Sequence, residues 1–249
     1  MIKTTNIKPI IQVINLHKSF GSNHVLNGFN MYLNEGENLV VMGKSGSGKS
    51  VMIKCLIGLE EYDGGKIIIM DKNMKNVNQS ELNEIRTEVG FLFQGSALYD
   101  SMSVRENLEF PLRRHTKKFG VIDDTTPLVM DALVNVGLEN TINLMPNELS
   151  GGMKRRIALA RTLILQPKII LYDEPTTGLD PITSKEIIEL IKSIQKKYKT
   201  SSIIITHDID CARVIANRMI LLIDGINYAE GTFDELASSK DPKIEAFFK

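Results

Sequence analysis

Short, nearly uninterrupted hydrophobic runs recur along the 249-residue chain, and each run ends in a turn or in a polar cluster. They lie at residues 38–42, 89–93, 169–172 and 203–206. Runs of this length without polar alternation are typical of parallel strands that are buried on both faces. The polar residues after each run would then lie at the carboxyl edge of an open α/β sheet, where such sheets place their ligands.

Helical patterns lie between these runs. Asp180 followed by Pro181 predicts a helix start, because aspartate caps the first turn and proline suits its first position. The hydrophobic residues that follow at helical spacing share one face; they are Ile187, Ile188, Leu190, Ile191 and Ile194. A second helix, rich in Arg, Ala and Leu, is predicted over residues 153–165.

Other hydrophobic segments alternate with polar residues or lie near glycines. Residues 10–16, 25–33 and 66–70 therefore predict an antiparallel accessory sheet. Asp224 and Gly225 separate two apolar stretches and predict a two-residue β-hairpin turn.

The middle of the chain has a different character. It contains three prolines, the basic run of residues 113–118 and a helical pattern over 128–138. We interpret residues 1–249 as a single domain in which a helical subdomain, residues 95–166, is inserted between two strands of the main sheet. The core with its antiparallel subdomain then comprises residues 1–94 and 167–249.

Composition excludes several classes of protein. Hydrophobic residues make up 43% and charged residues 24% of the chain, which argues against a disordered or fibrous protein. Thirty basic and thirty acidic residues cancel, so charge gives no support to a dedicated nucleic-acid binder. No apolar run approaches the ~18 residues of a membrane helix. Cys55 and Cys211 are too few for a disulfide framework, and we expect two free thiols in a soluble, cytoplasmic protein.

The strongest chemical motif is a glycine-rich loop that fits G-x-x-x-x-G-K-[ST] between a predicted strand and a predicted helix. The phosphate loop consists of Gly43, Lys44, Ser45, Gly46, Ser47, Gly48, Lys49 and Ser50. Its glycines let backbone N–H groups converge on phosphate oxygens, and the helix end adds about half a positive charge. Lys49 is expected to reach the β- and γ-phosphates of ATP, and Ser50 to bind Mg²⁺. The alternative is a glycine-rich turn with a chance lysine.

Two further strand ends carry candidate chemistry. Asp173 directly follows a hydrophobic run, where an aspartate can hold Mg²⁺, and Glu174 after it could polarise an attacking water. The alternative is a pair of solvated carboxylates. His207 follows the run 203–206 and could sense the γ-phosphate, although a lone histidine is more often structural.

One segment determines the family resemblance. Residues 149–156, Leu-Ser-Gly-Gly-Met-Lys-Arg-Arg, resemble the signature of ATP-binding cassette (ABC) proteins, and the resemblance extends over nearly the whole chain. It implies a P-loop NTPase (RecA-like) core with an antiparallel β subdomain and an inserted α-helical subdomain. The resemblance also implies roles for single residues. Gln94 would be the Q-loop glutamine and a magnesium ligand, and Asp173 and Glu174 would be the Walker B pair. Residues 177–180, ending in Asp180, would be the D-loop, His207 the switch histidine and Phe20 the aromatic that stacks on adenine.

The signature segment, residues 149–156, follows the same physical logic as the phosphate loop. Ser150, Gly151 and Gly152 offer a hydroxyl, bare backbone amides and a helix dipole to an anion. The family solution is a head-to-tail dimer that holds ATP between the phosphate loop of one copy and the signature of the other. The resemblance further implies a separate membrane permease as partner, at the inner face of the cell membrane.

A narrower resemblance concerns the cargo. Met153 stands where many transporters have glutamine, and this feature is similar to the ATPases of Mla/Mce-type phospholipid transporters. Residues 93–107, 110–113 and 180–183, and the end of the chain with Phe247 and Phe248, show a similar likeness. They imply a phospholipid cargo and an Mce-type substrate-binding protein as a further partner.

Other functions stay open at this point. The cargo could instead be an amino acid, a peptide or a metabolite. The chain could also be a non-transport ABC ATPase that acts on nucleic acid or on an assembly machine, although we expect no nucleic-acid partner. A regulatory module that binds nucleotide without turnover is a third alternative. Phe247 and Phe248 could contact a partner, or could close over the C-terminal hairpin.

Overall fold

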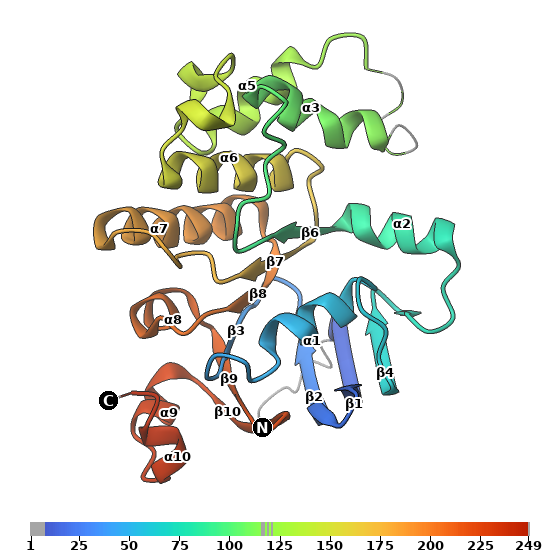
Figure 1. Ribbon diagram of the computed structural model, residues 1–249, viewed down its shortest axis with the longest axis vertical. Coiled ribbons are helices and arrows are strands. Elements are labelled where there is room, and N and C mark those ends of the chain that lie inside the picture. Colours follow the sequence, from blue (N-terminus) through green and yellow to red (C-terminus); the bar gives the residue numbers. More distant parts are fainter. Residues whose placement is uncertain (1–7, 116–117, 119, 121, 249) are drawn as a thin grey trace, which may run out of the picture. The chain divides into compact units, whose positions relative to one another are not determined.

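The computed structural model describes residues 8–115, 118, 120 and 122–248. They pack into two compact units (Figure 1). The first unit comprises Met1–Ile85 and Ser201–Lys249, and the second comprises Arg86–Thr200. The chain therefore leaves the first unit once and returns to it. The predicted subdomain boundaries at residues 94/95 and 166/167 stay a prediction.

The first unit contains the predicted strands at residues 38–42 and 203–206. Strand β3 (Asn38–Met42) pairs in parallel with β8 (Ser201–Ile205) and with β9 (Arg218–Ile223), and β10 (Ile226–Gly231) lies antiparallel to β9. Every residue of β3 and β8 is buried, as the uninterrupted hydrophobic runs predict. Helices α1 (Lys49–Leu56) and α8 (Ile209–Ile215) follow β3 and β8 along the chain.

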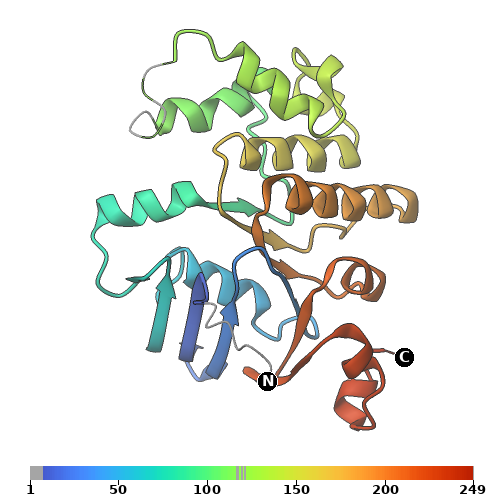
Figure 2. The same ribbon diagram turned by 180° about the vertical axis from the view of Figure 1, so that it is seen from behind.

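The predicted antiparallel accessory sheet is confirmed. Its strands are β1 (Ile11–Phe20), β2 (Asn23–Leu33), β4 (Gly64–Ile69) and β5 (Lys72–Asn73), in the order β2-β1-β4-β5. The blue and cyan strands lie side by side in both Figure 1 and Figure 2. Register shifts in β1 mark bulges that bend this sheet.

The predicted hairpin turn is also confirmed, and it has a second function in the fold. Asp224 and Gly225 both adopt positive φ, 53° and 78°, between the antiparallel strands β9 and β10. The Asn27 amide of β2 donates to the Gly225 carbonyl oxygen at 2.9 Å. A side-chain carbon at Gly225 would lie 2.9 Å from the Val25 carbonyl oxygen, so only glycine allows this approach.

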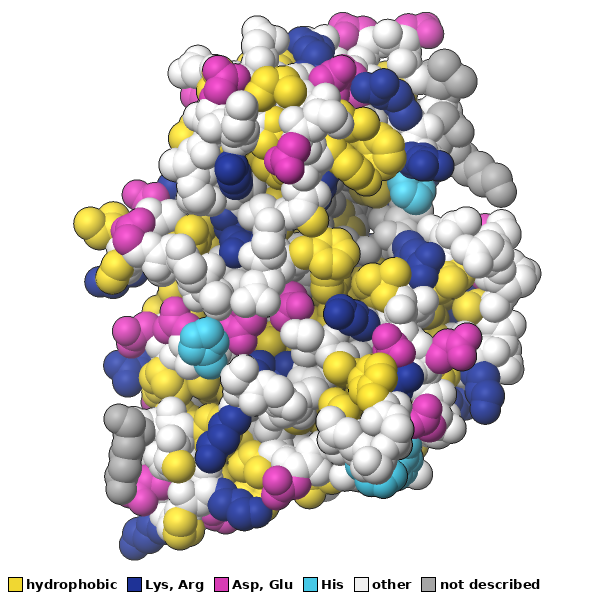
Figure 3. Space-filling model, viewed as in Figure 1, with side chains coloured by type: hydrophobic (Ala, Val, Ile, Leu, Met, Phe, Trp, Pro, Cys, Tyr) yellow, Lys and Arg dark blue, Asp and Glu magenta, His cyan; other side chains and the backbone are white. Residues whose placement is uncertain are grey.

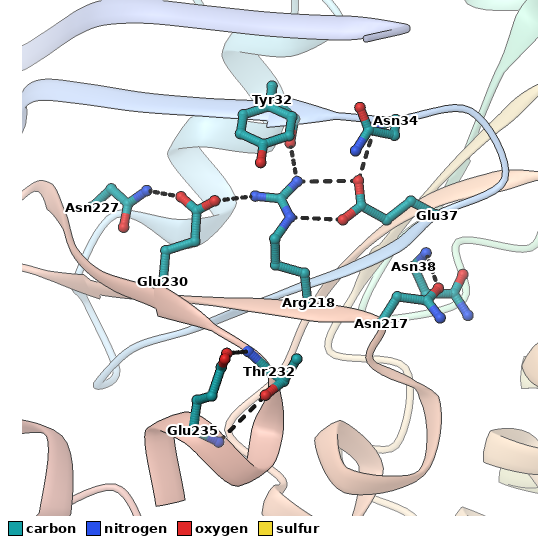
Figure 4. A network of polar contacts seen from close by, with 10 residues as sticks. All are labelled: Tyr32, Asn34, Glu37, Asn38, Asn217, Arg218, Asn227, Glu230, Thr232 and Glu235. Carbon is teal, nitrogen blue, oxygen red and sulfur yellow. Dashed lines mark hydrogen bonds and ion pairs between the residues drawn. The ribbon is translucent and has the colours of Figure 1, made fainter. Parts of the chain in front are cut away.

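A buried ionic network joins β2 to β9 and β10 (Figure 4). The Arg218 guanidinium donates to both carboxylate oxygens of Glu37, at 2.7 and 3.1 Å, and to Glu230 at 2.5 Å. It also donates to the Tyr32 carbonyl oxygen and lies 4.0 Å from the centre of that ring. Such a bidentate pair with satisfied donors fixes the geometry of the three strands.

The second unit contains a short parallel strand pair and a group of helices. Strand β6 (Val89–Leu92) pairs in parallel with β7 (Ile169–Asp173). The predicted helices at 128–138 and 153–165 are confirmed with shifted ends, because loops take up their last residues. The helices are α2 (Gln79–Glu88, across the boundary between the units), α3 (Val104–Arg114), α5 (Thr126–Val134), α6 (Gly151–Leu163) and α7 (Pro181–Tyr198), with 3₁₀ turns at Glu139–Thr141 and Pro146–Glu148.

The helices α3, α5 and α6 share one hydrophobic core, and both ribbon views show them together (Figures 1 and 2). Its fully buried members include Val104, Leu108, Val129, Leu133 and Ile157. This core orients α6, whose first residues belong to the signature segment. Helix α7 begins as predicted, with Asp180 as its cap.

The last helices of the chain are part of the first unit. Helices α9 (Phe233–Ala237) and α10 (Pro242–Glu245) follow β10, and the rings of Phe233 and Phe248 meet edge to face at 5.4 Å. Phe248 thus packs within the chain, which is one of the two alternatives expected for it.

The structure also bears on the cysteines, the surface charges and the hydrophobicity of the helices. Cys55 and Cys211 are free and buried, as expected, and burial raises the pKa of the Cys55 thiol to about 11. Figure 3 shows acidic and basic side chains mixed over the face that it draws. Among the described residues, no helix is both long enough and apolar enough to cross a membrane.

Candidate active site

The phosphate loop runs from the end of β3 to the start of α1. Gly48 caps α1 with a φ of 100° and Gly46 has a φ of 78°, so both positions require glycine. No side chain caps this helix end. The Lys49 ammonium is buried and donates to the carbonyl oxygens of Gly43 and Lys44, at 2.7 and 3.0 Å. The loop thus curls around its own lysine and leaves the helix dipole open to an anion.

The close packing behind the loop explains its first glycine. A side-chain carbon at Gly43 would lie 2.5 Å from the Ser47 hydroxyl oxygen and 2.7 Å from the Leu222 carbonyl oxygen. The Ser47 hydroxyl is buried and has no hydrogen-bond partner among the described residues. An unsatisfied hydroxyl inside a glycine-rich loop is consistent with a ligand that supplies the missing bond.

A pocket of about 790 Å³ opens beside the phosphate loop, within the first unit. Residues 44–47 form one wall, and His24 and Val25 of β2 form another. The turn of the β9–β10 hairpin completes it together with Lys243 and Phe247. Sequence reasoning missed His24, Val25 and Lys243, because only the packing of segments that are distant in sequence brings them to the loop.

Phe20 is the last residue of β1, immediately before the turn into β2. Its ring is 47% exposed, and the Lys18 ammonium lies 4.6 Å from the ring centre. The ring is therefore partly exposed at a strand end, with the Lys18 ammonium over it. The described lining of the pocket does not include Phe20.

His207 lies at the same sheet edge as the phosphate loop. It follows β8, which pairs in parallel with β3, with Ile205 opposite Val41. Both strands therefore deliver their next residues to one edge, as the sequence predicts. The His207 side chain is exposed.

The acidic pair lies at the end of β7 in the second unit. Asp173 and Glu174 are 7% and 9% exposed, so neither is the solvated carboxylate of the alternative. Glu174 adopts a φ of 52°, a left-handed conformation that is strained for a residue other than glycine. The Thr177 hydroxyl donates to the Glu174 carboxylate at 3.1 Å and orients it.

Ser150 begins α6, and its hydroxyl oxygen accepts from the Met153 amide at 3.2 Å. Neither glycine after it has a positive φ, and only Gly152 satisfies a packing requirement. A side-chain carbon at Gly152 would lie 2.5 Å from the Thr183 methyl, and one at Gly151 would lie 3.7 Å from Leu179. The signature segment therefore lies directly against the D-loop, residues 177–180, and the start of α7.

Asp180 closes the D-loop and caps α7. Its carboxylate accepts from the Thr183 hydroxyl and from the Thr183 and Ile182 amides. These bonds, with the one from the Thr183 hydroxyl the largest, lower the pKa of the Asp180 carboxyl. Gln94 is exposed in the loop after β6.

Each unit thus gathers part of the predicted site. The first unit places the phosphate loop and His207 at one sheet edge. The second unit places the signature segment against the D-loop, close in sequence to Asp173 and Glu174. Among the described residues, no group of three or more His, Cys, Asp or Glu side chains forms a metal cage. The individual roles of these residues stay predictions.

Residues 26–177 match a family model described as ABC transporter. The chain belongs to this family. It is an ABC transporter ATP-binding protein that hydrolyses ATP, and the predicted family, fold and enzymatic class are confirmed.

Curated relatives extend the likeness over nearly the full chain. The methionine import ATP-binding protein MetN of Clostridium tetani is 41% identical over 216 residues, which cover 87% of this chain and 67% of that protein. The "Probable ribonucleotide transport ATP-binding protein mkl" of Mycobacterium bovis is 40% identical, with 95% and 66% covered. Protein TRIGALACTOSYLDIACYLGLYCEROL 3 of Arabidopsis thaliana is 36% identical, with 96% and 73% covered. The chain thus spans about two thirds to three quarters of these relatives.

Solved structures agree with the fold. A dimeric bacterial ABC transporter cassette is 32% identical, with a TM-score of 0.82 over 90% of this chain and 98% of the other. A dimeric cassette in a post-hydrolysis state, bound to ADP and phosphate, gives a TM-score of 0.80 at 33% identity over the same shares of the two chains.

The names of the relatives do not assign this chain to the Mla phospholipid systems.

Proposed function

We propose that two copies of this ABC protein close head to tail around two ATP molecules and drive a separate membrane permease. One observation carries the proposal: the chain has two glycine loops that each open a helix, one in each unit. A helix end that carries partial positive charge favours an anion. A symmetric dimer in which each copy supplies one loop to each nucleotide then contains two equivalent sites. The dimeric related cassettes support this arrangement.

The residues of each loop have distinct roles in this scheme. The amides of residues 43–48 and the Lys49 ammonium hold the phosphates. Phe20 stacks on the adenine. Ser150, Gly151 and Gly152 of the second copy face the γ-phosphate, and Asp180 holds the segment that carries them across the interface. Closure is a population shift, because ATP contacts both copies only in the closed state.

Magnesium fits the donors that the chain offers. Ser50, Gln94 and Asp173 supply hydroxyl, amide and carboxylate oxygens, which are the ligands this ion prefers, and Mg²⁺ is usually held by a few protein oxygens together with phosphates. When bound, the ion would neutralise charge on the β- and γ-phosphates.

Glu174 polarises the attacking water in this scheme, and His207 contacts the γ-phosphate. The strained backbone of Glu174 and its bond from Thr177 support the role, since strain concentrates at functional sites. The buried carboxylate has few rotamers left, so it is already oriented before the water arrives. Chemistry of this kind depends on positioning and electrostatics and needs no covalent intermediate.

The permease is a separate polypeptide in this proposal, and it places the ATPase at the inner face of the cell membrane. Gln94, in the loop after β6, would pass closure to a permease helix docked near residues 95–114. The named relatives are transport ATP-binding proteins, which supports this assignment.

We further propose a phospholipid cargo, with an Mce-type binding protein as an additional partner. Met153 in the signature and the likeness of residues 93–107 to that subgroup support it. The Arabidopsis relative is itself named for a galactolipid. A second candidate cargo is an amino acid, favoured by the 41% identity to a methionine importer.

Glu174→Gln tests the ATPase mechanism. The amide keeps the size and cannot accept the proton of the water, so turnover should fall about 10²–10⁴-fold. ATP binding should persist, and dimers should accumulate with MgATP in size-exclusion chromatography. Glu189→Gln, an exposed glutamate on α7, is the matched control and should keep parental turnover. Unchanged hydrolysis by Glu174→Gln would refute the assigned role.

The cargo is tested by purifying the full complex from membranes in mild detergent and identifying its subunits and bound small molecules by mass spectrometry. The proposal expects a permease, a phospholipid and an Mce-type protein. A permease with an amino-acid-binding protein and no retained lipid would establish the second candidate in its place.

A further inference from the structure

Two arginines of α6 hold the loop that contains Gln94, one on each side of it. Nη1 of Arg155 donates to the Phe93 carbonyl oxygen at 2.8 Å, immediately before Gln94. Nη2 of Arg161 donates to the Ser96 carbonyl oxygen at 3.1 Å, two residues after it. Neither guanidinium forms an ion pair in the part of the chain that the structure describes. Each guanidinium donates to one main-chain carbonyl beside Gln94, and Arg161 also donates to the Asn107 side-chain oxygen at 3.3 Å.

Arg155 also contacts the D-loop, whereas the second hydrogen bond of Arg161 goes to Asn107. Nη2 of Arg155 lies 3.4 Å from the carbonyl oxygen of Thr177, in the D-loop. The side chain is buried, with 4% of the residue exposed, and its Nε has no hydrogen-bond partner among the described residues. The nearby Asp173 carboxylate interacts electrostatically with this charge. A buried, incompletely satisfied guanidinium is costly, so an arginine at this place points to a role beyond packing.

The contacts of Arg155 therefore connect three segments. The residue lies on the helix that begins at Ser150, it binds the carbonyl before Gln94, and it reaches the D-loop. We infer that Arg155 is a positioning residue for ATP hydrolysis: it fixes the Gln94 loop and the D-loop to the signature helix, so that the three respond together when the nucleotide site closes. This inference rests on the proposed roles of those segments.

The chemistry of the side chain suits this role. A guanidinium is planar, carries five donors and stays charged, so it can bind two carbonyls that lie in different directions. Lysine keeps the charge but has a single nitrogen, and it cannot reproduce the fork. Methionine fills similar space and removes both the charge and the donors. The two substitutions therefore separate charge near Asp173 from attachment of the two loops.

Arg156 supplies a matched control one position further along the same helix. Its guanidinium donates to the Glu186 carboxylate and to the Val136 carbonyl oxygen, and it contacts neither loop. Arg156→Met therefore removes a guanidinium with two acceptors from α6 and leaves the Gln94 loop and the D-loop attached. This variant measures how much kcat falls when α6 loses an arginine that contacts neither loop.

The first experiment measures MgATP hydrolysis by the full chain with Arg155→Met, Arg155→Lys and Arg156→Met. We expect Arg155→Met to lower kcat at least tenfold with KM for ATP within twofold of the parent. Arg155→Lys should recover only part of that loss, and Arg156→Met, which keeps both loops attached, should lower kcat less than Arg155→Met does. A purely structural role would instead give equal losses in Arg155→Met and Arg156→Met. If Arg155→Met does not fold, Arg155→Lys against Arg156→Lys is the comparison.

The second experiment observes the loop directly. The chain contains no tryptophan, so Phe93→Trp places one reporter beside the carbonyl that Arg155 binds. In this background, MgATP should shift the tryptophan emission, and Arg155→Met should abolish the shift while ATP still binds. An emission shift that persists in Arg155→Met, or a kcat within twofold of the parent, would overturn the inference. Either result would leave the Glu174→Gln test of the proposed function unaffected.

Discussion

The phosphate loop and the signature segment each open a helix with glycines, but they use the glycines for different reasons. Gly46 and Gly48 adopt positive φ, and the end of α1 has no side-chain cap. Gly151 and Gly152 do not adopt positive φ, and α6 has a serine cap. Gly152 is required because Thr183 lies against it. The glycines of the phosphate loop thus leave an uncapped helix end that suits an anion. Gly152 of the signature segment instead makes room for Thr183, and the start of α6 is still a helix end.

This difference indicates that the phosphate loop depends less on neighbouring segments than the signature segment does. The phosphate loop surrounds its own lysine and borders a pocket within its unit. In the signature segment, the Ser150 hydroxyl oxygen already accepts a hydrogen bond from the Met153 amide. An anion bound at this helix end would therefore come from outside the segment. Substitutions in the two loops should therefore fail in different ways.

Ser150→Arg should have the largest effect. The added bulk and length would block the approach of a second copy, so hydrolysis should fall on the order of 10³-fold, as when an essential anion donor is lost. ATP binding to the single copy should persist, measured by equilibrium dialysis. Ser193→Arg, at an exposed serine of α7, is the control. Normal hydrolysis by Ser150→Arg would contradict the proposed shared site.

Lys49→Ala should fail at the earlier step of binding. A ligand at 100 times its Kd stabilises the folded chain by about 2.7 kcal/mol, which raises Tm by about 5–10 °C for a protein of this size. The variant should lose this shift with MgATP in a thermal melt. Lys54→Ala, an exposed lysine of α1, should keep it. A parental shift in Lys49→Ala would place the phosphates elsewhere.

Gly152→Ala should have the smallest effect, and it should act on stability. The new methyl would meet the Thr183 methyl at 2.5 Å, and overpacking of this kind costs about 1–3 kcal/mol. We expect a lower Tm without nucleotide. Gly151→Ala faces Leu179 at 3.7 Å, an ordinary contact, and should cost less. Equal Tm values for the two variants would show that the D-loop can move away freely.

Local patterns were sufficient to predict most of the fold. Uninterrupted hydrophobic runs predict β3, β7 and β8 because each strand is buried on both faces. Asp180 predicts the start of α7, because an N-cap acts within a few residues. The ends of α5 and α6 were less well predicted, since helix ends are decided by packing that the periodicity does not encode.

The place of a candidate motif in the fold was predictable where the motif is one continuous segment of the chain. The phosphate loop is one continuous segment, and so is the acidic pair. In the structure, each follows the end of a strand. The contacts of Arg155 were not predictable, because Phe93 and Thr177 lie 62 and 22 residues away along the chain. Val25 was missed for the same reason, since its place beside Gly48 depends on the accessory sheet.

The turn at Gly225 has a practical consequence. A tight two-residue hairpin is ordinarily a good place to splice in an epitope tag or a fluorescent reporter, because loop tips tolerate insertions. Here the turn touches the backbone of Val25 and Asn27, and Val25 in turn borders the phosphate loop. A tag inserted there would disturb the wall of the pocket beside the phosphate loop, so labelling strategies should use another part of the surface.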